Sequence, residues 1–172
     1  MSDQLLPGYL LRAGSGLDRA LLVKFMQRTY QELFQNQDVS HLARTVEQYF
    51  SKETPLWWVE FRGEEGGTEE RYSSSPALKV ACLWVGNAVD QVMSDRHAHI
   101  FLLYVMPEHR RRGIGKALMR YVEDWALLRG DRQIGLQVFQ SNQPALNLYN
   151  QLGYQTQSLW MVKPLRLRDM AE

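Results

Sequence analysis

The segment of residues 105–116 constrains the fold more than any other part of the chain. It joins an uninterrupted apolar run at residues 100–106 to a helical stripe that begins near Gly113. An apolar run without alternation is typical of a strand buried on both faces, and Pro107 ends it because proline cannot donate to a strand ladder. A buried strand that leads directly into a helix predicts an α/β architecture with this strand inside the sheet.

The same segment has the composition of an anion-binding turn. The first amide groups of a helix lack intrahelical acceptors and carry about half a positive charge, so they can hold a phosphate. Gly113 and Gly115 carry no Cβ atom that would keep a ligand from the backbone. Residues 107–116 contain four Lys or Arg and one Glu, a local charge of +3. A diphosphate therefore fits this turn better than a carboxylate does.

Other interpretations of this turn have weaker support. Arg110, Arg111 and Arg112 also fit a solvated charge run, which is common on protein surfaces. A nucleic-acid site is disfavoured because no extended basic face accompanies the arginines. The P-loop pattern fails because Lys116 lies only three residues after the first glycine, Gly113, and the dinucleotide fingerprint fails because Leu118 stands where its third glycine is required.

Apolar spacing and Gly or Pro breakers divide the rest of the chain into short strands and amphipathic helices. We expect strands at residues 9–12, 57–61, 77–85, 100–106, 134–139 and 154–163. We expect helices at residues 17–34, 40–50, 113–129 and 142–152. Residues 62–76 are rich in Gly, Glu, Ser and Thr and predict a solvated loop. The order predicts one α/β layer with both antiparallel and parallel strand neighbours.

Length and charge bound the class of protein. The chain has 172 residues, with 20 Lys+Arg against 19 Asp+Glu, so we expect one domain over residues 1–172 and no overall attraction to nucleic acid or membrane. Its apolar runs are far shorter than the ~20 residues of a membrane helix, and its first residues do not resemble a signal peptide. Cys82 is the single cysteine, which excludes an internal disulfide framework and a thiolate zinc site and favours a cytoplasmic setting.

Two motifs resemble those of the GNAT superfamily of acyl-CoA-dependent N-acyltransferases. The first is Arg110-Arg111-Arg112-Gly113-Ile114-Gly115, which matches Arg/Gln-x-x-Gly-x-Gly/Ala and is preceded by Leu103-x-Val105-x-Pro107. The second is Asn142-x-x-Ala145-x-x-Leu148-Tyr149-x-x-x-Gly153-Tyr154. The resemblance covers residues 98–154 well, and before that only the order of elements is similar.

The resemblance implies an α/β fold with a single mixed seven-stranded sheet, splayed central parallel strands and flanking helices. Residues 100–105 and 134–139 would be the splayed strands, and the gap between them would receive the pantetheine arm of acetyl-CoA. Backbone groups at the strand end would contact the acetyl and pantetheine portion, the turn would hold the diphosphate, and an asparagine would contact the pantetheine. The residues implied for these contacts are Leu103, Tyr104, Val105, Arg110, Arg111, Arg112, Gly113, Ile114, Gly115, Lys116 and Asn142.

The resemblance also implies groups that move protons. An amine must be neutral to attack a thioester, and the departing thiolate needs a proton donor. Tyr149 stands where family members commonly place that donor, and a phenol is protonated at neutral pH. The matching position for the base is His99, while Gln137 occupies a second family position and cannot accept a proton. His97 and ordered water stay open as alternatives, and Cys82 lies in an apolar setting that argues against a covalent scheme.

We therefore expect an N-acetyltransferase that uses acetyl-CoA as acyl donor and a primary amine as acceptor. The acceptor amine would belong to a protein N-terminus, a lysine or a small molecule. A homodimer is left open. No metal, nucleic acid or membrane partner is expected. The alternative is a non-catalytic acyl-CoA-binding or sensor domain, which would share the phosphate turn and need no proton-transfer groups.

Overall fold

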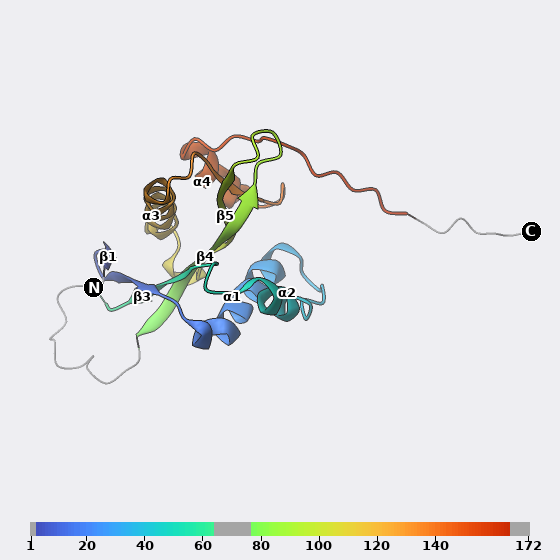
Figure 1. Cartoon of the computed structure of the whole chain (residues 1–172). Coiled ribbons are helices and arrows are strands. Elements are labelled where there is room, and N and C mark those ends of the chain that lie inside the picture. The colour runs from blue at the N-terminus through green and yellow to red at the C-terminus, as the bar shows by residue number, and fades with distance from the viewer. Residues whose placement is uncertain (1–2, 64–76, 166–172) are drawn as a thin grey trace, which may run out of the picture.

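A mixed six-stranded sheet forms the centre of the computed structural model, which describes residues 3–63 and 77–165 (Figure 1). The strand order is β1-β2-β3-β4-β5-β6, and every neighbouring pair is antiparallel except the parallel pair β5 and β6. The strands are β1 Asp3–Leu6, β2 Tyr9–Ala13, β3 Leu56–Phe61, β4 Leu78–Val89, β5 Arg96–Val105 and β6 Ile134–Leu136. The α-helices are α1 Arg19–Leu33, α2 Leu42–Tyr49, α3 Ile114–Arg129 and α4 Gln143–Gln151, with 3-10 turns at Gly16–Asp18 and Pro107–His109.

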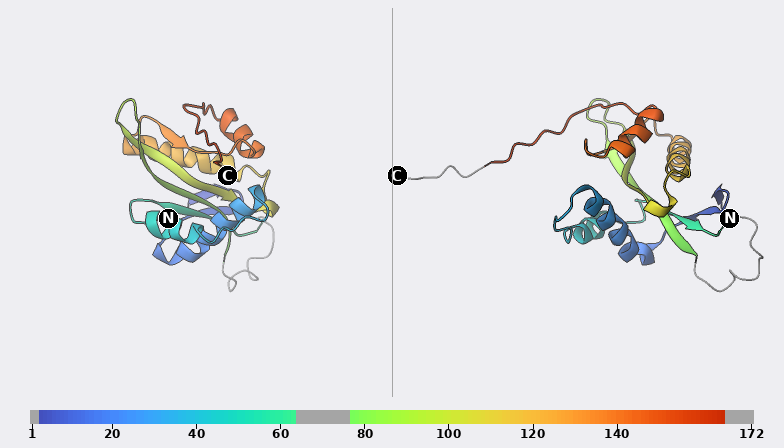
Figure 2. Two further views of the ribbon diagram at one scale, coloured as in Figure 1. Left: turned by 90° about the vertical axis from the view of Figure 1, so that its right-hand side faces the viewer. Right: turned by 180° about the vertical axis from the view of Figure 1, so that it is seen from behind.

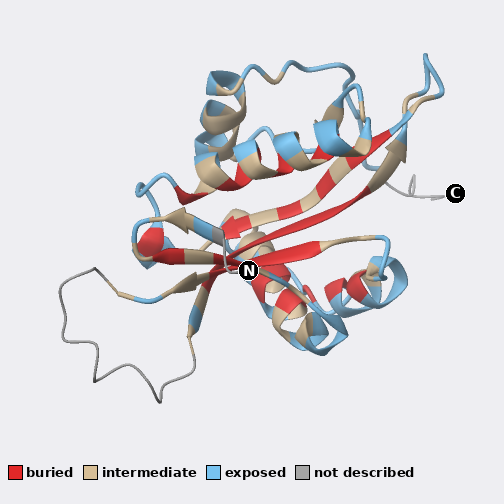
Figure 3. Cartoon of the chain, turned by 60° about the vertical axis from the view of Figure 1, so that its left-hand side comes forward, coloured by how far each residue is buried: buried red, intermediate tan, exposed pale blue. Residues whose placement is uncertain are grey.

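Helices cover both faces of the sheet, with α1 and α2 on one face and α3 and α4 on the other (Figures 1 and 2). On the first face, the apolar stripe of α1 places Phe25 edge-on to Trp58, with ring centroids 5.1 Å apart. On the second, Leu118 and Val122 of α3 are fully buried against the sheet. Buried residues concentrate along the central strands and on the inner faces of the helices, as Figure 3 shows. Among the described residues, no helix has the length and apolar character needed to cross a membrane.

The two parallel strands part from each other halfway along β5. Their ladder ends where Ile100 pairs with Leu136, while β5 continues to Val105 with β4 as its only strand neighbour within residues 3–63 and 77–165. A β-bulge accompanies the separation, since the β4–β5 register shifts between Trp84 and Val85. Bulges bend a strand and increase its twist. The expected splaying of the central parallel strands is thus confirmed.

The strand count and two of the expected strands differ from the structure, although the fold class is as expected. The described part of the chain has six strands in its sheet instead of seven, because residues 154–163 do not join it and run away from the body (Figure 1). The strand expected at 134–139 ends at Leu136 because it loses its partner where β5 diverges. β1 was not anticipated, and most of the loop expected at 62–76 lies outside the described residues.

Candidate active site

The turn between β5 and α3 contains a row of backbone amides without backbone acceptors in the described structure. Arg111 and Gly113 both have positive φ angles, +62° and +84°, which fold the chain back before α3 begins at Ile114. The Ala117 amide donates to the Gly113 carbonyl at 2.9 Å, and it is the first amide at the start of α3 with a backbone acceptor. Within the described part of the chain, the amides of residues 111–116 have no backbone acceptor. These free donors stand at the positive end of a 16-residue helix.

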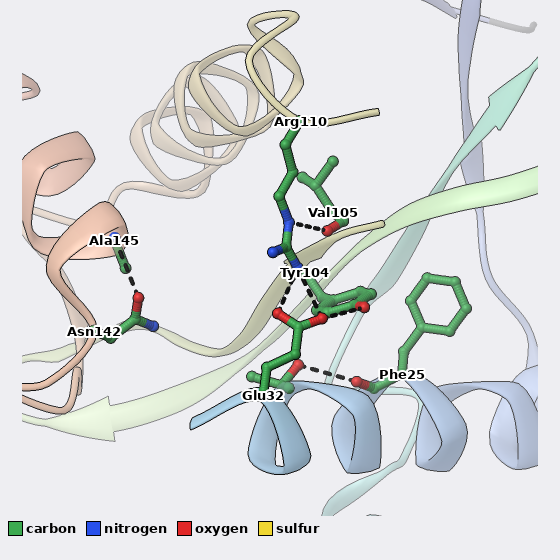
Figure 4. Close-up of polar contacts among 8 residues, drawn as sticks. Phe25, Glu32, Tyr104, Val105, Arg110, Asn142 and Ala145 are labelled. Atoms are coloured by element: carbon green, nitrogen blue, oxygen red, sulfur yellow. Dashed lines mark hydrogen bonds and ion pairs between the residues drawn. The ribbon is translucent and has the colours of Figure 1, made fainter. Parts of the chain in front are cut away.

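Arg110 ties the beginning of this turn to α1. Its Nε donates to the Val105 carbonyl at 2.8 Å, and its Nη2 donates to both carboxylate oxygens of Glu32, at 3.0 and 2.7 Å. The Tyr104 hydroxyl donates to the same carboxylate at 2.8 Å. Figure 4 shows these side chains converging between β5 and the last turn of α1. The Arg110 guanidinium therefore contacts both Glu32 of α1 and Val105 of β5. These bonds fix the position of the turn relative to the end of β5 and to α1.

The other two arginines of the turn differ in their surroundings. Arg112 Nη1 donates to the Tyr9 hydroxyl at 3.2 Å, and that hydroxyl also contacts Nδ1 of the buried His109 at 3.0 Å. Arg111 is exposed, as is Lys116 in the first turn of α3. Neither Arg111 nor Lys116 forms an ion pair with any residue that the structure describes. These two cations are therefore free to meet an anion at the helix N-terminus.

The open edge of β5 offers further backbone groups. Met106 donates its amide to Val80 of β4 at 2.8 Å, and backbone groups of an antiparallel strand alternate between its two sides. The amides of Leu103 and Val105 therefore point to the side from which β6 has parted, while those of Tyr104 point toward β4. The Val105 carbonyl is already bonded to Arg110. Among the described residues, the Leu103 and Val105 amides have no partner on the side of the gap.

Asn142 and Gly115 both take part in placing α4. Asn142 is the N-cap of α4, and its Oδ1 accepts from the Ala145 amide at 3.3 Å, which leaves the side-chain NH2 group free to donate (Figure 4). A Cβ atom at Gly115 would lie 3.3 Å from Cδ2 of Leu148. The glycine therefore permits close packing of α3 on α4. Sequence reasoning assigned Gly115 to ligand access alone and did not foresee this contact.

Tyr149 lies on α4 and is partly buried against the core on the α3 face. Burial raises the pKa of its phenol to about 12. The hydroxyl is therefore fully protonated at neutral pH, which is the state that a proton donor requires. Its ring is 5.8 Å from that of Tyr154, so the second motif brings the two tyrosines together.

The candidate base His99 lies on β5 opposite Gly135 of β6. Its ring contacts Phe101, which packs against the α1 and α2 core, so His99 is on that face of the sheet. Burial, followed by the nearby His97, lowers the pKa of His99 below its usual 6.5. The imidazole is therefore neutral at pH 7. His97 is itself buried and its Nδ1 contacts Gln133 Nε2 at 3.3 Å, in a pocket at the far end of β5.

An open hollow of about 390 Å³ lies beside the Arg110–Glu32 pair. Its lining residues come from α1, from the end of β5 and from the turn that follows β5: Arg28, Gln31, Glu32, Tyr104, Met106, Pro107 and Glu108. Burial and the bond to Glu32 raise the pKa of Tyr104 to about 12. Sequence reasoning missed Glu32, because a glutamate on the polar face of an amphipathic helix carries no local signal that it faces a site.

Cys82 is fully buried in β4, and burial raises the pKa of its thiol far above the usual value. A buried protonated thiol is a poor nucleophile. The structure therefore agrees with the expectation that this cysteine is a packing residue.

The comparisons with known proteins agree with this geometry. Residues 23–154 match the profile of the acetyltransferase (GNAT) family. An uncharacterized N-acetyltransferase of Methanocaldococcus jannaschii is 30% identical over 112 residues, which cover 62% of this chain and 48% of the relative. The matches span between 26% and 52% of the length of this and four other curated relatives.

Two solved structures share the fold at low sequence identity. A Pyrococcus furiosus protein provisionally described as an acetyl transferase superposes with a TM-score of 0.70 and 23% identity, over 91% of this chain and 99% of that one. A Clostridium acetobutylicum protein described as a predicted acetyltransferase was crystallised with acetyl-CoA. It superposes with a TM-score of 0.67 and 18% identity, over 91% of this chain and 96% of that one.

Proposed function

The chain belongs to the acetyltransferase (GNAT) family, and from this membership we propose that it transfers an acetyl group from acetyl-CoA to a primary amine by direct attack. The observation that carries the proposal is the row of amides at residues 111–116, which have no backbone acceptor in the described structure. They stand at the start of α3 beside Arg111 and Lys116, which form no ion pair with any described residue. Such a row suits the diphosphate of a nucleotide. The Clostridium acetobutylicum structure with acetyl-CoA supports the choice of donor.

Each part of the donor has a matching group in this chain. The amides of residues 111–116, with the side chains of Arg111 and Lys116, would hold the diphosphate. The unpaired amides of Leu103 and Val105 would face the thioester and pantetheine in the gap left by β6, and the free NH2 group of Asn142 would contact the pantetheine. Arg110 acts as a positioning residue, because its guanidinium is bonded to Glu32 and Val105.

The chemical step needs two proton movements. The amine nitrogen attacks the thioester carbonyl, a C–N bond forms, and the C–S bond breaks. The ammonium proton passes to His99 or to ordered water, and His97 is a weaker candidate because its ring lies at the far end of the strand. Tyr149 donates a proton to the departing thiolate, which a phenol can do as sulfur gains charge.

The acceptor would enter through the hollow between α1 and β5. Glu108 places a carboxylate there that forms no ion pair with any described residue, whereas the Glu32 carboxylate is paired with Arg110. Carboxylates attract the ammonium form of an amine before it is deprotonated. A protein N-terminus, a lysine side chain and a small-molecule amine all fit this chemistry.

A panel of primary amines, with free thiol released from acetyl-CoA as the readout, tests the proposal. We expect turnover with at least one acceptor class, and we expect Glu108→Gln to raise the KM for that amine while the Kd of acetyl-CoA stays unchanged. His99→Gln should lower kcat if the imidazole is the base. Acetyl-CoA binding without thiol release across amino acid, peptide, polyamine and aminoglycoside acceptors would favour the non-catalytic acyl-CoA-binding alternative.

A further inference from the structure

A hydrogen-bonded network leads from the turn after β4 to the candidate base His99. The Asp90 carboxylate accepts a bond from Gln133 Nε2 at 2.9 Å, and the same Nε2 lies 3.3 Å from Nδ1 of His97. His97 is buried, and it precedes His99 by two residues on the same face of β5. The turn after β4, the strand β5 and the residue before β6 thus each contribute to one polar network.

Gly135 lets the two imidazoles approach the same place. A Cβ atom at this position of β6 would lie 3.1 Å from Nε2 of His97 and 3.4 Å from Nδ1 of His99. Both ring nitrogens therefore face one spot above Gly135, which the missing side chain leaves open. The network from Asp90 to His97 thus continues to a particular nitrogen of His99.

The charge on Asp90 determines which way the Gln133 amide faces. The bond from Gln133, then the amides of Met93 and Val92, lower the pKa of Asp90 below its usual value, so its carboxylate is ionised at neutral pH. An ionised carboxylate can only accept, so the NH2 group of Gln133 faces it. The second hydrogen of that NH2 group is left for His97. Because an NH2 group can only donate, Nδ1 of His97 carries a lone pair and Nε2 carries the proton.

We propose that the Asp90–Gln133 pair, acting through His97, fixes the tautomer of the candidate base. In this tautomer Nδ1 of His99 has the lone pair and accepts the proton of the amine. The His97 Nε2–H group is directed at the spot above Gly135 that His99 Nδ1 also faces. Two N–H groups directed at one spot repel each other, so the proton of His99 is placed on Nε2. Burial, then the nearby His97, lowers the pKa of His99, so the ring is neutral at pH 7 and has one lone pair.

The role of the network in catalysis rests on the proposed function. An N–H bond of the ammonium breaks, its electron pair stays on the amine nitrogen, and the proton forms an Nδ1–H bond on His99. The result is an imidazolium ion with a proton on each nitrogen. His97 does not receive this proton, because its Nε2 is already protonated and its Nδ1 is bonded to Gln133. Asp90, Gln133 and His97 are therefore positioning residues.

The first test observes the tautomers directly. The full chain is labelled with 15N at histidine, and two-dimensional NMR at pH 7 correlates the ring nitrogens with the ring carbon protons. His97→Gln and His99→Gln assign the signals. We expect both rings to have a protonated Nε2 and an unprotonated Nδ1. A protonated Nδ1 in either ring, or a mixture of tautomers, overturns the proposal. The measurement needs neither acetyl-CoA nor an amine, so it decides the tautomers whether or not acetyl transfer is found.

The second test is Asp90→Asn, which keeps the shape of the side chain and exchanges one oxygen for an NH2 group. The remaining oxygen can still accept from the amides of Val92 and Met93, so the new NH2 group faces Gln133. Gln133 must then present its oxygen to this group and to His97, whose Nδ1 becomes a donor. We expect the His97 proton to move to Nδ1. His99 should change in the same way, because its Nδ1 then faces an unprotonated nitrogen.

Asp95→Asn is the matched control. It removes the same charge from the same hairpin, but the Asp95 carboxylate pairs with Arg132 at 3.5 Å and lies outside the network. We expect Asp95→Asn to keep the natural tautomers and kcat. Asp90→Asn should lower kcat at least about tenfold with the Kd of acetyl-CoA unchanged, because general bases contribute about 100- to 10,000-fold.

Three results would overturn the proposal. The first is natural tautomers in Asp90→Asn, and the second is an equal effect of Asp90→Asn and Asp95→Asn on the tautomers. The third is an active enzyme in which Asp90→Asn reverses both tautomers and kcat does not fall.

Discussion

Arg110 Nη2 lies 2.7 Å from Glu32 Oε2, an ion pair that joins the turn at the start of α3 to a helix on the other face of the sheet. Both side chains remain about 40% exposed, at 41% and 39%. An exposed pair of this kind contributes at most about 1 kcal/mol to stability. We infer that its main effect is to fix the position of the turn relative to the acceptor hollow.

Arg110→Lys keeps the charge and removes the Nε bond to the Val105 carbonyl. One net hydrogen bond contributes about 0.5–1.5 kcal/mol to stability, so we expect a small fall in melting temperature. We also expect the Kd of acetyl-CoA to rise, because the turn is no longer held in place. Isothermal titration measures the Kd. Arg132→Lys, in an exposed pair with Asp95 remote from the turn, is the control. Equal effects of the two substitutions would refute a positioning role for Arg110.

Gly113→Ala tests the left-handed turn before α3. The φ of +84° costs an alanine about 1–2 kcal/mol, although its Cβ would meet only Leu6 Cδ1 at 3.9 Å. We therefore expect lower stability to denaturant without steric clash. Gly16→Ala is the matched control, since a Cβ there has no neighbour within 4 Å and the φ is not positive. Equal stability of the two variants would show that the turn tolerates a side chain.

Tyr149→Phe removes the candidate proton donor and keeps the ring. General acids contribute about 100- to 10,000-fold in rate, so we expect kcat to fall at least about tenfold with the acetyl-CoA Kd nearly unchanged. Tyr154→Phe, whose ring is 5.8 Å away, controls for loss of a neighbouring hydroxyl. Unchanged kcat in Tyr149→Phe would assign thiolate protonation to water. A weaker acetyl-CoA affinity with unchanged kcat would mean that the hydroxyl binds acetyl-CoA and does not donate the proton.

His109 makes stability depend on pH. Burial, then Arg112, lowers its folded-state pKa below the usual 6.5, against a weaker opposite effect of Glu108. As pH falls through 6.5 the unfolded chain therefore binds protons before the folded one, and stability decreases. We expect the free energy of unfolding to drop between pH 7 and pH 5, and to drop less in His109→Gln. The lowered pKa values of Asp18, Asp38 and Asp90 act below this window. A pH profile identical in both proteins would contradict the assignment.

The parts of the fold that the sequence predicts are those with strong local patterns. The unbroken apolar run of β5, the glycines around α3 and the Asn142 cap of α4 each mark an element by itself. β1 has only four residues and depends on pairing with β2, so no local pattern marks it. The strand expected at 154–163 does not form in the described structure, because an apolar pattern does not specify a partner strand.

In the candidate site, too, some features follow from the local sequence and others depend on contacts between distant residues. Backbone donors at residues 111–116 follow from local sequence, because glycine spacing and a helix start determine them. Glu32 is 78 positions from Arg110, and only the packing of α1 across β5 brings them together. The Gly115 contact with Leu148 likewise depends on how α3 meets α4.

The most direct test of the account is a titration of the purified full chain with acetyl-CoA, followed by thermal melting. A ligand present at a hundred times its Kd adds about 2.7 kcal/mol to the free energy of unfolding, so a clear rise in melting temperature is expected. Adenosine, which lacks the diphosphate, should raise the melting temperature much less. Lys116→Glu should reduce the rise in melting temperature that acetyl-CoA causes. A melting temperature unmoved by saturating acetyl-CoA would contradict the assignment of the residue 111–116 turn as its binding site.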